Sequence, residues 1–199
     1  MSTQSRLSFH PATPDRWPDL EVLFGTSGAD AGCWCMSWRQ TDAVSANATP
    51  EHNRTSFKGQ IDSGASTGVL AYRGDKAVGW CGVSPRASFV RLEGHPYFQN
   101  PTTDQALWTI ICLFVSRQAR KQGVASGLLN AAVKHAIANG ARAIEAYPVN
   151  SHGKPLTAKE AFPGTVPMFL KIGFKEIAAT QAKSRSGGFF RSIVRYDVP

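Results

Sequence analysis

The chain has 199 residues, of which 42% are hydrophobic, and its 22 Lys and Arg against 14 Asp and Glu give a formal net charge of +8. This length and composition fit one globular domain over residues 1–199 and exclude a disordered chain. The positive charge suits an anionic partner, but the cations form no basic run, so we expect no specific nucleic-acid partner.

Hydropathy and cysteine spacing indicate the compartment. No apolar segment approaches the roughly 18 residues of a membrane span, and the residues after Met1 lack the apolar centre of a signal peptide. We therefore expect a soluble, cytoplasmic protein without a membrane partner. Its four cysteines include only a C-x-C pair, at Cys33 and Cys35. Zinc sites favour C-x₂₋₄-C pairs, so we predict reduced, buried thiols and no metal.

The first half of the chain reads as a strand, two helices and a hairpin. The apolar spacing of residues 16–25 predicts a helix that ends at Gly25, and Thr49-Pro50 is typical of the start of another. Two apolar runs flank the tight turn at 73–76. The expected elements are a strand within 7–15, helices within 16–25 and 48–64, and two strands within 67–85.

In the second half, residues 106–115 are nearly all apolar, as in a strand that is covered on both faces. The apolar stripe that begins at Val124 predicts an amphipathic helix that Asn139-Gly140 ends. Further expected elements are a strand within 141–149, a short helix within 163–174, and strands at 175–180 and 189–198. This order predicts a mixed α/β (α+β) domain.

The turn between residues 115 and 124 carries the clearest chemical signal. The first N–H groups of a helix lack intrahelical partners and carry partial positive charge, so they bind phosphate readily. Gly123 allows a close approach of the backbone, and Ala125 is the next smallest residue. Ser126 adds a hydroxyl, and Arg120 and Lys121 add charge. We therefore predict that this turn binds a pyrophosphate.

Other phosphate-binding and nucleic-acid motifs do not fit. The chain contains no G-x-x-x-x-G-K-[ST], and no G-x-G-x-x-G follows a strand. A helix-turn-helix would need a helix before the turn, where a strand is expected here. Instead, Val115-x-Arg117-x-x-Arg120-x-x-Gly123-x-Ala125 resembles the acetyl-CoA-binding motif of the GCN5-related N-acetyltransferases (GNAT). The later Phe169-x-x-x-Gly173-Phe174 resembles a second segment of that family.

The resemblance implies a mixed, mostly antiparallel sheet that is flanked by helices and has splayed fourth and fifth strands. It implies acetyl-CoA (coenzyme A) as the cofactor, with the pantetheine arm pairing with the backbone of Leu113 and Val115. The pyrophosphate would lie on the amides of Gln122, Gly123, Val124 and Ala125, with Ser126 nearby. The acetyl group would pass directly to the primary amine of a small molecule, peptide or protein. Separately, a homodimer is a possible assembly of the chain.

The catalytic groups are less evident. The family often has tyrosine, as an acid for the departing thiolate, where this chain has Phe169, whose ring can only pack against the cofactor. A noncatalytic acyl-CoA-binding protein is therefore the alternative. Glu145 and Tyr147 share a face of one strand and are candidates for base and acid. The other interpretation of Glu145 is a structural ion pair.

The acceptor site is expected beside the segment 32–40. Trp34, Trp38 and Arg39 can form an aromatic wall with a cation, or they can fill the core. Tyr97 belongs to an expected lid over residues 93–100, in which His95 is either a base or simply solvated. The long connection at 150–164 is expected to cover the cofactor or the acceptor.

Overall fold

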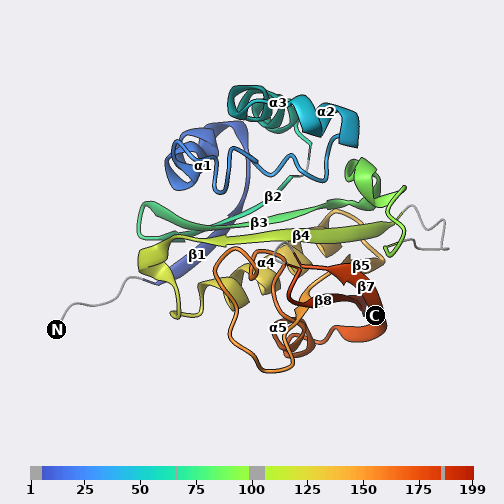
Figure 1. Ribbon diagram of the computed structural model, residues 1–199. Helices are drawn as coiled ribbons and strands as arrows, with labels where there is room; N and C mark the ends of the chain where they lie inside the picture. Colours follow the sequence, from blue (N-terminus) through green and yellow to red (C-terminus); the bar gives the residue numbers. More distant parts are fainter. Residues whose placement is uncertain (1–5, 66, 99–105, 185–186) are drawn as a thin grey trace.

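The computed structural model describes residues 6–65, 67–98, 106–184 and 187–199 (Figure 1). The strands are β1 (Leu7–Pro11), β2 (Gly68–Arg73), β3 (Lys76–Pro85), β4 (Leu107–Val115), β5 (Ala143–Ala146), β6 (Val149–Asn150), β7 (Lys175–Lys183) and β8 (Phe190–Asp197). The α-helices are α1 (Trp17–Phe24), α2 (Asp42–Asn47), α3 (Pro50–Asp62), α4 (Val124–Ala138) and α5 (Val166–Leu170). No helix in these ranges is long and apolar enough to cross a membrane.

The strands form one mixed sheet in the order β1-β2-β3-β4-β5-β8-β6, with β7 also paired to β8. The β4–β5 pair is parallel, and the other pairs of named strands are antiparallel. Pairing of β4 with β5 ends at Ile110 and Ala146, although β4 continues to Val115. The two strands therefore part where the β4–α4 turn begins, and the predicted fold class is confirmed.

Helices cover both faces of the sheet (Figure 1). On one face α4 packs on β1 to β4, and α5 contacts β7 and β8, around a core that includes Leu128, Ala132 and Val194. On the other face α1 packs on β3, with Phe57 of α3 and Trp80 of β3 in a second cluster. A third cluster on this second face contains Phe98, Ile111 and Tyr147. It lies next to the cavity described below.

The predicted helix ends are confirmed. The Thr49 hydroxyl accepts a hydrogen bond from the His52 amide (3.1 Å), and Pro50 is the first residue of α3. At α4, Gly123 is the N-cap with φ 78°, and Gly140 follows the C-cap with φ 90°. The left-handed region is strained for residues with a Cβ, so glycine is suited to both positions.

The structure differs from the prediction in three places. Helix α2, which Thr41 caps, was not predicted, because its six residues show too little periodicity. Strand β5 ends at Ala146, and β6 follows after the sequence Tyr147-Pro148, since proline has no N–H to donate to a ladder. Strand β7 extends three residues beyond the predicted end, to Lys183.

Candidate functional site

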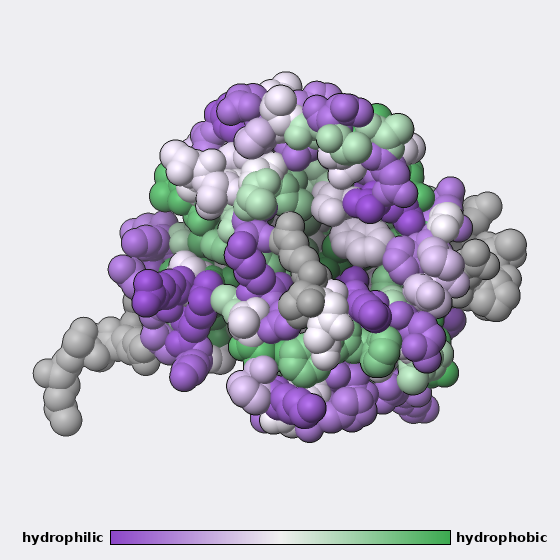
Figure 2. Space-filling view, viewed as in Figure 1, coloured by the Kyte–Doolittle hydropathy of each residue, from purple (hydrophilic) through white to green (hydrophobic). Residues whose placement is uncertain are grey.

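The turn from β4 into α4 has the geometry that phosphate binding requires. The Gly127 N–H donates to the Gly123 carbonyl (3.0 Å), so the amides of Val124, Ala125 and Ser126 precede it in the first turn. A Cβ built at Gly123 would meet no atom within 4 Å, so the space over the amides is open. Hydrophilic residues gather where this turn lies, at the left of the molecule (Figure 2). These features fit a diphosphate.

The polar side chains of the turn are partly used within it. The Arg120 Nε donates to the Val115 carbonyl (3.1 Å). The side chain predicted to bind the diphosphate is therefore hydrogen-bonded to a backbone group predicted to pair with the pantetheine arm. The Gln122 side chain bonds to Arg73 and to the Gln118 carbonyl. Lys121 and Ser126 are exposed beside the helix N-terminus. The predicted diphosphate residues thus lie together at one helix end.

The long connection at 150–164, which was expected to cover the cofactor or the acceptor, enters the space between β4 and β5. The Leu113 N–H donates to the Phe162 carbonyl (2.6 Å), and the Phe162 ring stacks on Phe114. The base of the loop is closed by the Val149 N–H, which donates to the Gly164 carbonyl (3.0 Å). We call residues 151–164 the strap. Phe162 thus occupies the backbone position of Leu113 at which a pantetheine arm was predicted.

Phe169 lies in the main core, fully buried on α5. Its ring is 5.1 Å from that of Phe174, and it would lie 2.7 Å from a Cβ placed on Gly164. It packs against the end of the strap and does not line the cavity described next. In this structure its aromatic packing is with the protein.

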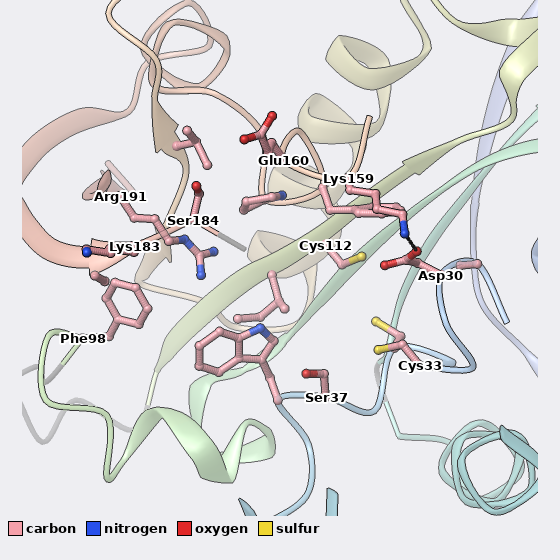
Figure 3. A pocket seen from close by; sticks show the side chains of 18 of the residues that line it. Asp30, Cys33, Ser37, Phe98, Cys112, Lys159, Glu160, Lys183, Ser184 and Arg191 are labelled. Atoms are coloured by element: carbon pink, nitrogen blue, oxygen red, sulfur yellow. Dashed lines mark ion pairs between the residues drawn. The ribbon is translucent and has the colours of Figure 1, made fainter. Parts of the chain in front are cut away.

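A cavity of about 390 Å³ opens on the face of the sheet opposite α4 (Figure 3). Its walls come from the segment 29–38, from residues 95–98, from the strap and from the β7–β8 hairpin, with Ile111 and Cys112 of β4 at its floor. A volume of this size is typical of small-ligand sites. The cavity also borders the splay between β4 and β5, because Phe162 contributes to its wall.

Two of the four predicted acceptor residues line this cavity, namely Trp38 and Tyr97. Trp34 does not, because its ring is 4% exposed and stacks on Trp17 in the second core cluster. Arg39 is also buried and donates to the Thr67 carbonyl (2.9 Å) and the Ser84 hydroxyl (2.8 Å). The structure therefore places Trp34 and Arg39 in the core, as in the second interpretation, and away from the cavity. Of the expected lid, Gln99 and Asn100 lie outside the described residues.

Neither Glu145 nor Tyr147 is among the described residues that line the cavity. The Tyr147 hydroxyl donates to Glu145 (3.3 Å), whose carboxylate also pairs with Arg195 (3.4 Å) and Arg86 (3.9 Å). Burial raises the pKa of Glu145 above its ordinary value, although both arginines act in the opposite direction. These contacts are those of the structural alternative, a buried polar network, and the base and acid roles of Glu145 and Tyr147 stay predictions.

Sequence reasoning missed Arg191, which reaches the cavity from β8. Its Nε donates to the Tyr147 carbonyl (2.7 Å), and its guanidinium lies over the rings of Phe98 (5.2 Å) and Trp38 (5.8 Å). Alternation along β8 was the available signal, because Arg191 shares a face with the buried Ile193. Nothing in its local sequence indicates which loops that face meets.

His95 also lines the cavity, with its ring stacked on Phe98 at 4.1 Å. Burial, and then the charges of Arg191 and Arg91, lower its pKa, so the imidazole is neutral near pH 7. The Tyr97 amide donates to its Nδ1 (3.3 Å), which leaves the proton on Nε2. In this tautomer Nδ1 is an acceptor and Nε2 a donor, and the role of His95 as a base stays a prediction.

All four cysteines are free thiols, and Cys33, Cys35 and Cys112 line the cavity. A hydrogen bond from Cys112, together with the charge of Arg39, lowers the pKa of Cys35 despite its burial. Within the described ranges, no group of three or more His, Cys, Asp or Glu side chains could hold a metal ion.

A model of the acetyltransferase (GNAT) family matches residues 34–158, which include the β4–α4 turn. No curated protein matches significantly. Similar solved structures include a GCN5-related N-acetyltransferase from Kribbella flavida, at 18% identity and TM-score 0.60, over 96% of this chain and 98% of that one. Ribosomal-protein-alanine N-acetyltransferase from Brucella melitensis matches at 13% identity and TM-score 0.57, over 96% of this chain and 99% of that one. The structure of yncA from Salmonella typhimurium was solved with its cofactor acetyl-CoA. It matches at 9% identity and TM-score 0.59, over 97% of this chain and 94% of that one.

Proposed function

Because the chain belongs to the acetyltransferase (GNAT) family, we propose that it is an N-acetyltransferase that uses acetyl-CoA. The acceptor is the primary amine of a small molecule, peptide or protein that enters the cavity lined by Trp38. Bound acetyl-CoA would supply a thioester whose acetyl carbon the amine attacks directly. The observation that carries this proposal is the glycine-opened first turn of α4 at the end of β4.

Several groups of the chain would position the two substrates. The amides of Gly123, Val124 and Ala125 would hold the diphosphate, with the charge of Lys121 beside them. The amine would approach from the cavity, whose floor at Cys112 directly precedes the Leu113 amide. Holding both reactants in one orientation is itself a large part of catalysis.

The proton of the acceptor ammonium must leave before or during the attack. The carboxylates that line the cavity are Asp30, which pairs with Lys159 (3.6 Å), and Glu160, which accepts from the Thr157 amide (2.9 Å) and hydroxyl (2.8 Å). His95 has its proton on Nε2 and acts as a donor. We therefore propose that the acceptor binds as the neutral amine, with its proton already lost to water.

The proposal is tested by incubating the protein with acetyl-CoA and a panel of primary amines. Release of the free thiol together with an N-acetylated product, detected by mass spectrometry, is the expected result. Thiol release that does not depend on the amine would mean hydrolysis and would contradict the proposed transfer.

A noncatalytic acyl-CoA-binding protein is the second candidate. One observation favours it: Phe169 has no hydroxyl to protonate a thiolate. Saturable binding of acetyl-CoA with no turnover across the amine panel would support this candidate over the transferase.

A further inference from the structure

We propose that the acceptor carries a carboxylate as well as its amine, and that Arg191 binds this carboxylate. The ligand class is an amino acid with an apolar body between or beside the two groups. The inference deepens the proposed function and rests on it for the reaction, although the binding site can be tested without turnover.

Arg191 is a cation whose hydrogen-bonding capacity is only partly used. Its Nε is taken by the Tyr147 carbonyl (2.7 Å), and no hydrogen bond joins its two terminal nitrogens to any residue within the described ranges. In Figure 3 the guanidinium extends into the cavity from β8, next to Ser184 and Phe98. An arginine that is held at Nε presents two parallel N–H donors end-on, which matches the two oxygens of a carboxylate.

The charge of Arg191 is also not balanced by the protein. Across the described part of the chain, no carboxylate lies within ion-pair distance of it. The nearby acids have other partners: Asp30 pairs with Lys159, and Glu145 pairs with Arg86 and Arg195. Arg191 is half-buried; this burial lowers its pKa to about 10, so it stays charged at pH 7. An unpaired charge that is partly removed from water gains from an opposite charge, and a ligand anion would supply it.

The rest of the cavity favours an apolar ligand body. The rings of Phe98 and Trp38 flank the guanidinium, while Ile111 and Ala182 contribute further apolar surface. His95, whose ring is stacked on Phe98, also lines the cavity and carries a donor at Nε2. A volume of about 390 Å³ is at the small end of ligand sites and suits an amino acid better than a folded protein surface.

The test compares matched acids and amides: L-phenylalanine with L-phenylalaninamide, L-leucine with L-leucinamide, and 6-aminohexanoate with its amide. For at least one pair, we expect kcat/KM and calorimetric affinity to favour the acid by about tenfold to a hundredfold, as for hydrogen bonds to charged groups. In Arg191→Gln this preference should disappear, while affinity for coenzyme A stays the same. Arg191→Lys keeps the charge but loses the paired N–H donors of the guanidinium. It should retain about a tenth of the preference for the acid.

Lys171→Gln, which removes an exposed cation outside the cavity, is the matched control and should keep the full preference. Equal affinity for acid and amide in all three pairs would overturn the inference, as would a preference that survives Arg191→Gln. If Arg191→Gln does not fold, Arg191→Lys decides in its place. Failure of the proposed function is separate: acids that bind through Arg191 but are never acetylated would support this site and contradict the transferase.

Discussion

Gly123 is the residue on which the proposed cofactor binding should most depend, since it combines a left-handed backbone with open space above it. Gly123→Ala should weaken coenzyme A binding by about tenfold, because the left-handed conformation costs about 1–2 kcal/mol with a Cβ and the first turn would shift. Isothermal titration calorimetry measures this change. Gly123→Glu, which adds a negative charge, should weaken binding further.

The chain offers a matched control at the other end of the same helix. Gly140 also has a positive φ, 90°, and open space around its Cβ position. Gly140→Ala should therefore lower the free energy of unfolding by about the same 1–2 kcal/mol as Gly123→Ala, without changing the affinity for coenzyme A. Equal affinity losses in the two variants would mean that Gly123 acts only through helix stability.

A substitution at Glu145 distinguishes a structural role in the buried network from a role as general base. Because Glu145 lies outside the cavity, Glu145→Gln should leave kcat within about twofold of wild type, far below the 10²–10⁴-fold loss of a general base. Steady-state acetyl transfer at saturating acetyl-CoA measures this. A loss of a hundredfold or more would restore Glu145 as the base.

The pKa of Glu145 also predicts a pH dependence of stability. Its folded-state pKa is raised, so its contribution is complete below the unfolded pKa of about 4.3 and is lost as the pH rises through the folded value. Urea unfolding from pH 4 to 7 should therefore show wild type losing stability relative to Glu145→Gln. The opposite trend would mean that Arg86 and Arg195 outweigh burial.

The strap occupies a backbone position of β4 that the proposed function assigns to the pantetheine arm. Its Phe162 carbonyl holds the Leu113 amide, and its ring stacks on Phe114. Phe162→Ala keeps the carbonyl but removes the ring that stacks on Phe114, so it should loosen the strap and tighten coenzyme A binding by about threefold to tenfold, the equivalent of one aromatic pair. In wild type, hydrogen exchange over residues 151–164 should rise when coenzyme A binds.

Leu170→Ala on α5 is the control, because Leu170 is 44% exposed. It should leave both measurements unchanged. If Phe162→Ala weakens coenzyme binding, or if exchange over the strap falls on binding, the strap supports the cofactor instead of competing with it.

Elements with local signals could be predicted from the sequence, and those set by distant contacts could not. The β4–α4 turn was predictable because Gly123 and the apolar stripe of α4 lie within a few residues of each other. The strap has no periodicity, and its partner Leu113 is far away in the sequence. Trp34 and Trp38 could not be separated, because Trp34 has a positive φ (46°) in an irregular segment where spacing does not define a face.

At the scale of the whole molecule, the net charge of +8 should act on the rate at which the polyanionic cofactor arrives. Between 0.05 and 0.5 M salt, the association rate of coenzyme A should fall by about tenfold, as screening shortens the range of attraction. Stopped-flow binding measures this rate. Pantetheine, which lacks the phosphates, should show little salt dependence; an equal dependence would exclude long-range steering.

The closed base of the strap has a consequence for engineering. Since Val149 and Gly164 are already joined by a hydrogen bond (3.0 Å), and Val149 also bridges to Thr165, the strap residues between Asn150 and Gly164 should be exchangeable without moving the register of β5 or β8. Loops of other lengths could be grafted between these two anchor points. Substrate range could then be diversified in a library that leaves the scaffold intact.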